Sequence, residues 1–139
     1  MCLDGDYDDP PRVEHASTPT ARKEHRCSEC SRIIAPGERY WRWAGLDYCG
    51  DPFVSKMCAH CRATIDLGVA LTGCPRFWFW EQIHELDPDD GGFVGDILAN
   101  HELSIADTVR MLRRVVQRRR QWRRPNGELY PLPQIPVAA

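Results

Sequence analysis

Two Cys-x-x-Cys pairs constrain this chain more than any other feature of its sequence. Cys27 and Cys30 form the first pair, Cys58 and Cys61 form the second, and 27 residues lie between the pairs. Four thiolates at this spacing can converge on one tetrahedral Zn²⁺, leaving no coordination position for a substrate water. The pattern therefore predicts a single structural zinc ion and argues against zinc as a catalyst.

Length and composition are those of a small globular protein. A chain of 139 residues suffices for one domain with a modest core. No apolar stretch approaches the roughly 20 residues that span a bilayer, so we expect no membrane segment. The acidic start lacks the basic and apolar regions of a secretory signal. Seven cysteines, four of them in metal-type pairs, fit a reduced compartment better than a disulfide scaffold, so we expect a cytoplasmic protein.

The order of elements around the cysteines predicts a treble-clef zinc finger. Cys27 to Cys30 reads as a knuckle, 35–38 as a turn, and 39–43 as a strand in which arginine alternates with aromatic residues. Residues 47–54 are expected to form a loop and a returning strand. A helix then follows from the second cysteine pair, with Cys61, Ile65 and Val69 spaced by four on one face.

The remainder of the chain predicts further helices. Proline at position 75 suits a first helical turn, which predicts a helix to about 86, and a short helix is expected over 93–100. Ser104 followed by Asp107 is typical of a helix start, and the next breaker is Pro125-Asn126-Gly127, which predicts a helix over 104–124.

These elements predict an α+β fold: a β-hairpin and helix around a four-cysteine zinc site, followed by about three helices. We divide the chain into four parts. They are an extended or partly disordered segment over 1–24, a treble-clef module over 25–72, a helical region over 73–127, and a proline-rich tail over 128–139.

Other roles for the cysteines and histidines stay open. Redox-active thiols would need one pair in a βαβ context, which the pattern lacks. His60 could replace one thiol, although an exposed histidine at a helix start is the simpler interpretation. A second metal site could combine Cys49, Cys74 and a histidine, with Cys2 also left over. No ligand spacing supports that site, and small buried cysteines are the alternative.

The second strong feature is a run of arginines near the C-terminus. Residues 1–103 carry 18 acidic and 10 basic side chains, whereas residues 104–139 carry 2 acidic and 8 basic ones, all arginine. On the predicted helix, Ile105, Val109, Leu112 and Val116 fall on one side and are expected to face the core. The opposite side carries a broad cationic face, made of Arg110, Arg113, Arg114, Arg118, Arg120 and Arg124.

Three interpretations of that cationic face compete. It could be a solvated surface offset by the acidic remainder of the chain. It could bind a nucleic-acid backbone, because guanidinium pairs with phosphate in a bidentate manner and several such contacts sum. It could instead bind an acidic protein surface. The sequence leaves the three open.

The sequence argues against an enzyme. It has no P-loop, G-x-S-x-G, H-E-x-x-H or Rossmann pattern, and no H-x-E of a zinc deaminase. A nuclease built on the zinc module would need a histidine base and metal-binding side chains on its helix, where 62–71 supply only Asp66. That activity remains a low-weight alternative. We expect no small-molecule substrate.

Several segments together resemble a known family. They are Ala21 to Cys30, the Pro36-Gly37-Glu38-Arg39-Tyr40 turn, Lys56 to Cys61, the Asp6-Tyr7-Asp8 start and the ending from Arg119 to Gly127. This combination resembles small zinc-binding proteins encoded by tailed phages and prophages, and it spans most of the chain. The resemblance implies a phage or prophage origin and hence a bacterial host cytoplasm. It implies no particular reaction.

The sequence therefore predicts a non-enzymatic phage accessory protein. It would bind one structural zinc ion and use the arginine helix to contact nucleic acid or an acidic protein surface. The alternative is a phage-encoded inhibitor that acts on a host defence system by protein–protein binding.

Overall fold

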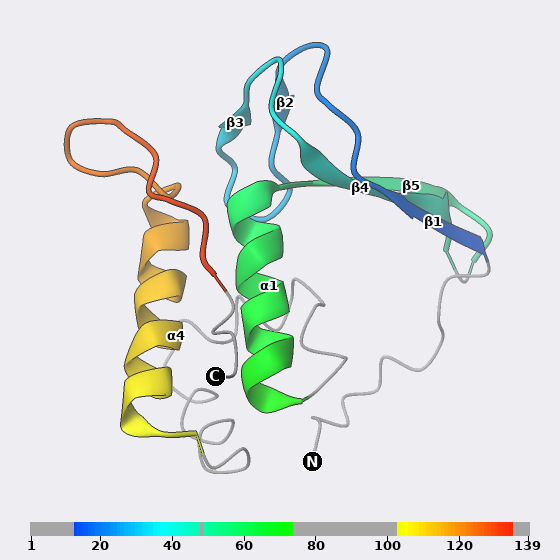
Figure 1. Cartoon of the computed structure of the whole chain (residues 1–139). Coiled ribbons are helices and arrows are strands. Elements are labelled where there is room, and N and C mark those ends of the chain that lie inside the picture. Colours follow the sequence, from blue (N-terminus) through cyan, green and yellow to red (C-terminus); the bar gives the residue numbers. More distant parts are fainter. Residues whose placement is uncertain (1–12, 48, 74–102, 135–139) are drawn as a thin grey trace. The chain divides into compact units, whose positions relative to one another are not determined.

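The computed structural model describes residues 13–47, 49–73 and 103–134 of the chain (Figure 1). The chain divides into two compact units, Asp4–Arg62 and Ala63–Ala139 with Met1–Leu3. We call the described residues of the first the cysteine unit and those of the second the α4 unit. The described part contains both strands and helices, which confirms the predicted mixed composition of the fold.

A three-stranded antiparallel sheet forms the frame of the cysteine unit. Its strands, in the order β1-β4-β5, are β1 (Val13–Ser17), β4 (Tyr40–Leu46) and β5 (Pro52–Cys58). Tyr40 pairs with Cys58 and Leu46 with Pro52, so β4 and β5 form a hairpin that ends at the second cysteine pair. The predicted strand at 39–43 is present and extends three residues further than expected.

Aromatic side chains gather on one face of this sheet. Trp41 and Trp43 lie two residues apart on β4, so they point to the same side. The ring of Trp43 meets that of Phe53 edge-on at 5.1 Å. The guanidinium of Arg62 lies 4.8 Å from the centre of the Trp41 ring, a cation–π contact. Trp41 is only 8% exposed, so this face supplies apolar burial to the cysteine unit.

A second, two-stranded sheet carries the first cysteine pair. Strands β2 (His25–Arg26) and β3 (Ile33–Ile34) pair antiparallel, and Cys27 to Arg32 connect them. The turn predicted at 35–38 follows β3, and Gly37 has a φ of 92°, which glycine adopts at little cost. The Glu38 carboxylate accepts a hydrogen bond from the Ala35 N–H, which closes the turn.

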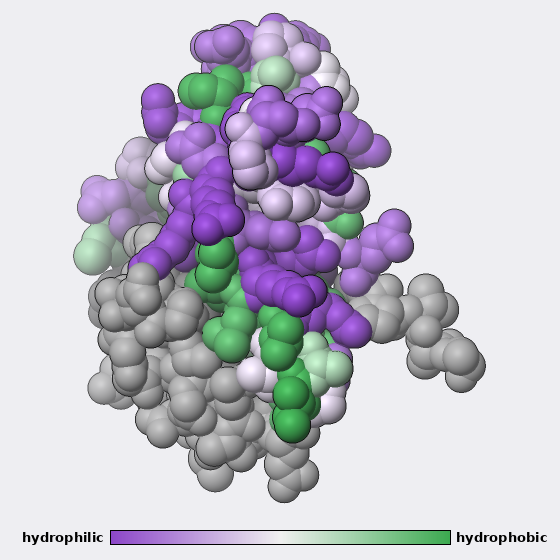
Figure 2. All heavy atoms as spheres, turned by 90° about the vertical axis from the view of Figure 1, so that its left-hand side faces the viewer, coloured by the Kyte–Doolittle hydropathy of each residue, from purple (hydrophilic) through white to green (hydrophobic). Residues whose placement is uncertain are grey.

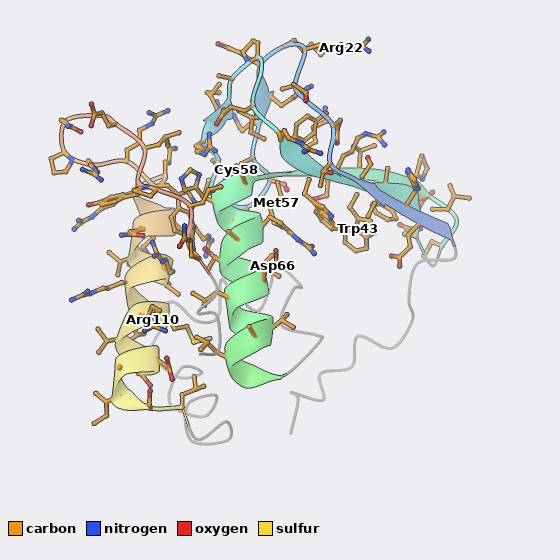
Figure 3. The ribbon with its side chains drawn as sticks, in the orientation of Figure 1. Arg22, Trp43, Met57, Cys58, Asp66 and Arg110 are labelled. Carbon is orange, nitrogen blue, oxygen red and sulfur yellow. The ribbon has the colours of Figure 1, made fainter. Side chains whose placement is uncertain are left out.

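Helix α1 (Ala59–Thr72) begins directly after β5, so the second cysteine pair lies at the junction of strand and helix. Figure 3 shows Met57 and Cys58 at this junction. Cys61 and Ile65 are buried, as their spacing predicted, whereas Val69 is partly exposed. The division between the two units falls within this helix, after Arg62.

Helix α4 (Ile105–Arg119) begins as predicted and ends early. The Ser104 hydroxyl accepts a hydrogen bond from the Asp107 N–H at 3.1 Å, which is an N-cap. At the other end, Trp122 N–H donates to Gln117 O and Gln121 N–H donates to Arg118 O. These two bonds form a Schellman motif, with Gln121 left-handed at the position that glycine usually takes. The predicted helix to 124 is therefore five residues too long.

The predicted buried face of α4 is wrong. Met111, Val115 and Arg118 are buried, whereas Ile105 is 85% and Val109 is 41% exposed. The apolar positions of α4 cover a wide arc, and at 100° per residue the buried side is centred about a third of a turn from the stripe that the periodicity favoured. The aliphatic part of an arginine can be buried, which allows Arg118 to lie on the buried face.

The chain turns back after α4. Trp122 is fully buried, and its carbonyl oxygen accepts a hydrogen bond from the Tyr130 N–H at 2.8 Å. Arg123 and Leu129 form an isolated β-bridge across the turn at 124–128. Residues 129–134 therefore belong to the fold of the α4 unit. The helices predicted at 75–86 and 93–100 lie outside the described residues. Neither α1 nor α4 combines the length and apolar character needed to cross a membrane.

Candidate metal centre

The structure brings the four cysteines of the two pairs together. Their sulfur atoms all lie within 4.8 Å of one another. Sγ of Cys27 is 3.9 Å from that of Cys61, and Sγ of Cys30 is 3.8 Å from that of Cys58. Sulfurs on a zinc tetrahedron with bonds of about 2.3 Å lie about 3.8 Å apart, whereas a disulfide needs about 2.05 Å. The spacing and the all-sulfur donor set fit a tetrahedral metal ion such as Zn²⁺.

Backbone amides surround the sulfur of Cys27. The N–H groups of Glu29, Cys30 and Cys58 donate to it at 3.4, 3.5 and 3.3 Å. The Cys61 N–H donates to Sγ of Cys58 at 3.5 Å. Donors of this kind stabilise a thiolate, the form that binds metal. The second pair thus supplies one of the donors that stabilise the sulfur of Cys27.

Hydrogen bonds attach the first cysteine pair to strand β5. Ser28 N–H donates to the carbonyl oxygen of Lys56 at 2.7 Å, and its hydroxyl donates to the same oxygen at 2.8 Å. The Ser28 hydroxyl also lies 2.9 Å from that of Ser55. These bonds hold the connection between β2 and β3 against β5, two residues before Cys58.

The backbone just after Cys30 is strained. Ser31 has a φ of 64°, a left-handed conformation that costs about 1–2 kcal/mol in a residue other than glycine. Its N–H donates to the carbonyl oxygen of Cys27 at 3.0 Å, and the Cys27 N–H donates to that of Arg32 at 2.9 Å. The left-handed residue closes the turn that presents both sulfurs to one point.

A buried arginine lies beside the centre. Arg32 is 2% exposed, and its guanidinium donates to both carboxylate oxygens of Glu38 at 3.1 and 3.2 Å. Burial opposes its charge, but the neighbouring Cys58 sulfur and the Glu38 carboxylate raise the pKa of Arg32 above its usual value. Four thiolates around one divalent ion leave two negative charges, and Arg32 offsets part of them. The sequence analysis did not single out Arg32. Its position two residues after Cys30 is the signal that could have identified it.

His60 is part of the same arrangement. It is 6% exposed, so the expectation of an exposed histidine is wrong. Its Nδ1 lies 3.3 Å from an Arg32 nitrogen. Arginine can only donate, so Nδ1 accepts and the imidazole proton is placed on Nε2. This contact assigns His60 to the support of the centre, since four sulfur ligands already suffice for a tetrahedral ion.

The four thiols differ in acidity when no metal shares their charge. Hydrogen bonds from Cys30, Cys58 and Cys61 lower the pKa of Cys27, while burial and its three neighbours raise the pKa of Cys61. One thiolate in the group thus makes ionisation of the others harder. A divalent cation removes that conflict, because it is attracted to all four thiolates.

The other candidate ligands do not join this group. Cys49 is exposed on the turn between β4 and β5, not buried as we had expected. Cys2, Cys74, His84 and His101 lie outside the described residues. Within residues 13–47, 49–73 and 103–134, the four paired cysteines are the one cluster with metal-ligand geometry.

The arginines predicted as a binding surface occupy three different settings. Arg113 is exposed on α4, Arg110 forms an ion pair with Asp107 at 3.1 Å, and Arg114 donates to the side chain of Gln117. Arg120 and Arg124 are exposed but lie beyond the end of the helix, and Arg124 covers the ring of Tyr130. Arg118 is buried, so it does not belong to the exposed surface.

A comparison of the chain with protein-family models, curated proteins and solved structures finds no match. The class of protein therefore rests on the geometry of the centre. Four cysteines at metal-ligand distance, three of them buried and one partly so, fit a metal-binding role.

Proposed function

We propose that this chain is a non-enzymatic zinc-binding protein of the treble-clef type that binds a macromolecule through the arginine-rich surface of α4. The observation that carries the proposal is the cluster of four cysteine sulfurs, which together fit the four ligands of a structural ion and would leave no position for a reacting water. The connection between β2 and β3, the hairpin β4–β5 and the start of α1 follow one another along the chain, and this order supports a treble-clef assignment.

The arginines supply the binding role. Positive charge covers part of α4 and the turn that follows. It comes from five arginines that are exposed or partly exposed: Arg110, Arg113, Arg114, Arg120 and Arg124. Figure 3 shows the Arg110 side chain on α4. Phosphate and carboxylate are the groups that such arginines bind best. The resemblance in the cysteine segments and the C-terminal ending supports a phage or prophage accessory protein in a bacterial cytoplasm.

Two measurements test this function. Metal analysis of reduced, purified protein is expected to give one zinc per chain, and markedly less would refute the structural site. Binding to duplex and single-stranded nucleic acid is then measured across a salt series, because phosphate contacts give a steep salt dependence. Arg113→Ala with Arg114→Ala is expected to flatten the slope, while Arg22→Ala with Lys23→Ala on the exposed loop before β2 serves as control.

The second candidate is an inhibitor of a host defence system that acts by protein–protein binding. The exposed aliphatic side chains of Ile105 and Val109 favour it, because nucleic-acid backbones offer little for such groups to bind. Copurification from a bacterial host tests it. A defence component retained by the intact chain and released by Val109→Gln supports the inhibitor, and copurification that retains no defence component argues against it.

A further inference from the structure

Helix α4 exposes an apolar stripe that borders its arginines. Ile105, Val109 and Leu132 are 85%, 41% and 49% exposed, and Leu112 and Val116 on the same side of the helix are partly exposed. Figure 2 shows a band of hydrophobic side chains running between hydrophilic ones on this face. An exposed aliphatic stripe on a helix that already buries Met111 and Val115 elsewhere has no role in the core of the described fold.

The same face is hollowed into a groove. One hollow of about 870 Å³ lies between α4 and the returning C-terminal segment, with Val109, Arg113 and Leu132 among its lining residues. A neighbouring hollow of about 320 Å³ shares Val109, Arg113 and Gln117 and extends toward Val116 and Tyr130. We call the two together the α4 groove. Its floor is largely aliphatic, and its polar wall carries Arg110, Arg113, Arg114 and Arg120.

The charge of the groove selects among occupants. The described residues that line it include four arginines and no carboxylate. Two effects lower the pKa of Arg114: burial is the larger, and the charge of Arg110 is the smaller. The second effect indicates that these two cations lie close enough to repel one another. An anionic occupant relieves that repulsion, and guanidinium groups bind carboxylates in a bidentate manner.

The aliphatic floor decides between the anions. A nucleic acid offers phosphates to the arginines, but its bases stack on aromatic side chains rather than on valine and leucine. Among the described residues that line the groove, the one aromatic side chain is Tyr130, and the guanidinium of Arg124 lies over its ring. A protein segment that carries carboxylates on one side and aliphatic side chains on the other satisfies both parts of the groove.

We infer that the α4 groove binds an acidic, amphipathic segment of another protein, with aliphatic side chains against Val109 and Leu132 and carboxylates on Arg113 and its neighbours. This inference rests on the proposed binding role of α4 and names its partner as protein. The exposed face from Ile105 to Arg120 is about 22 Å long at 1.5 Å per residue, which suits a helical partner segment of about four turns.

The test is a selection from a random library of displayed peptides of about 16 residues, a length that covers this face as a helix. The target is the full, zinc-loaded chain. Enriched peptides are expected to combine Asp or Glu with aliphatic residues at helical spacing. Val109→Gln or Arg113→Glu is expected to weaken the selected peptides at least about tenfold, as loss of a central contact does.

Matched controls lie in the cysteine unit. Val54 on β5 is 56% exposed and Arg22 is exposed, so Val54→Gln and Arg22→Glu make the same chemical changes away from the groove. Both are expected to leave peptide binding within about twofold. Zinc content and far-UV circular dichroism show that each variant is folded.

Other outcomes overturn the inference in distinguishable ways. Selected peptides that lack this composition refute the inferred partner. Selected peptides that bind the Val109→Gln variant as tightly as the parent chain refute the groove as the binding site. Salt-dependent DNA binding that Arg113→Ala weakens, with no peptide enriched, refutes the inference and leaves the proposed function standing. Absence of both DNA binding and peptide enrichment refutes the inference and the proposed binding function together. Self-association that Val109→Gln abolishes identifies a second copy of the chain as the occupant and likewise overturns the inference.

Discussion

The cysteine unit and the α4 unit use arginine in opposite ways. Arg32 beside the sulfurs is 2% exposed and contacts the Glu38 carboxylate and the His60 imidazole, whereas Arg113 on α4 is exposed and lines the groove. A buried cation with fixed partners contributes to the stability of its surroundings. An exposed cation beside other cations contributes little to folding and is available to a partner. The same residue type thus supports structure in one unit and recognition in the other.

Loss of a metal ligand is expected to have the largest effect. Zinc binding supplies about 10–16 kcal/mol in small zinc domains, so Cys58→Ser or chelation should unfold the cysteine unit. Zinc content and the near-ultraviolet dichroism of the sheet tryptophans measure the loss. Cys49→Ser is the matched control, since that thiol is exposed and outside the cluster. A Cys58→Ser protein that keeps one zinc and its native spectrum would contradict the proposed centre.

Replacement of the two contrasted arginines tests the comparison directly. Arg32→Met removes the buried guanidinium that contacts Glu38 and His60 and should cost about 2–4 kcal/mol of unfolding free energy. Arg113→Met should change it by less than about 0.5 kcal/mol. Arg32→Lys should restore little, because lysine lacks the planar fork that reaches both partners. Urea unfolding of the zinc-loaded chain gives these values, and equal costs at the two positions would break the comparison.

Each unit also contains a residue other than glycine in a left-handed conformation. Ser31 has a φ of 64° and Gln121 has a φ of 55°. Ser31→Gly and Gln121→Gly should each raise the unfolding free energy by about 0.5–1 kcal/mol, because the relieved strain exceeds the added chain entropy. Arg120→Gly is the control. Its φ is −83°, so glycine there should lower stability. A gain at Arg120, or a loss at both Ser31 and Gln121, would contradict this account.

Sequence reasoning succeeded where the constraint is local. The spacing within each Cys-x-x-Cys pair identified the four residues of the cluster, and the Ser104 cap located the start of α4, because each of these signals lies within four consecutive residues. It failed where burial depends on the rest of the fold. The apolar arc of α4 is wide, so periodicity alone could not tell the Met111 side from the Val109 side. The early end of α4 could not be predicted either. Gln121 takes the left-handed conformation that ends the helix, and the usual sequence signal for that conformation is glycine.

His25 and Lys56 provide the smallest expected effect and the finest test of the cysteine unit. Partial burial, then the charges of Lys56 and Lys23, lower the pKa of His25, and the Lys56 amine lies 3.1 Å from its Nδ1. Because lysine only donates, Nδ1 accepts and the imidazole is neutral. The folded state therefore binds this proton less readily than the unfolded state. The contribution to stability is complete above the unfolded pKa near 6.5 and is lost as the pH falls below it.

Replacement of the lysine separates its charge from burial. Lys56→Met should raise the pKa of His25 toward its ordinary value, and Lys56→Arg should leave it low, because the positive charge remains. A proton NMR titration of the imidazole measures the pKa in each zinc-loaded variant. If Lys56→Met leaves the pKa of His25 unchanged, the lysine contact is not formed in solution.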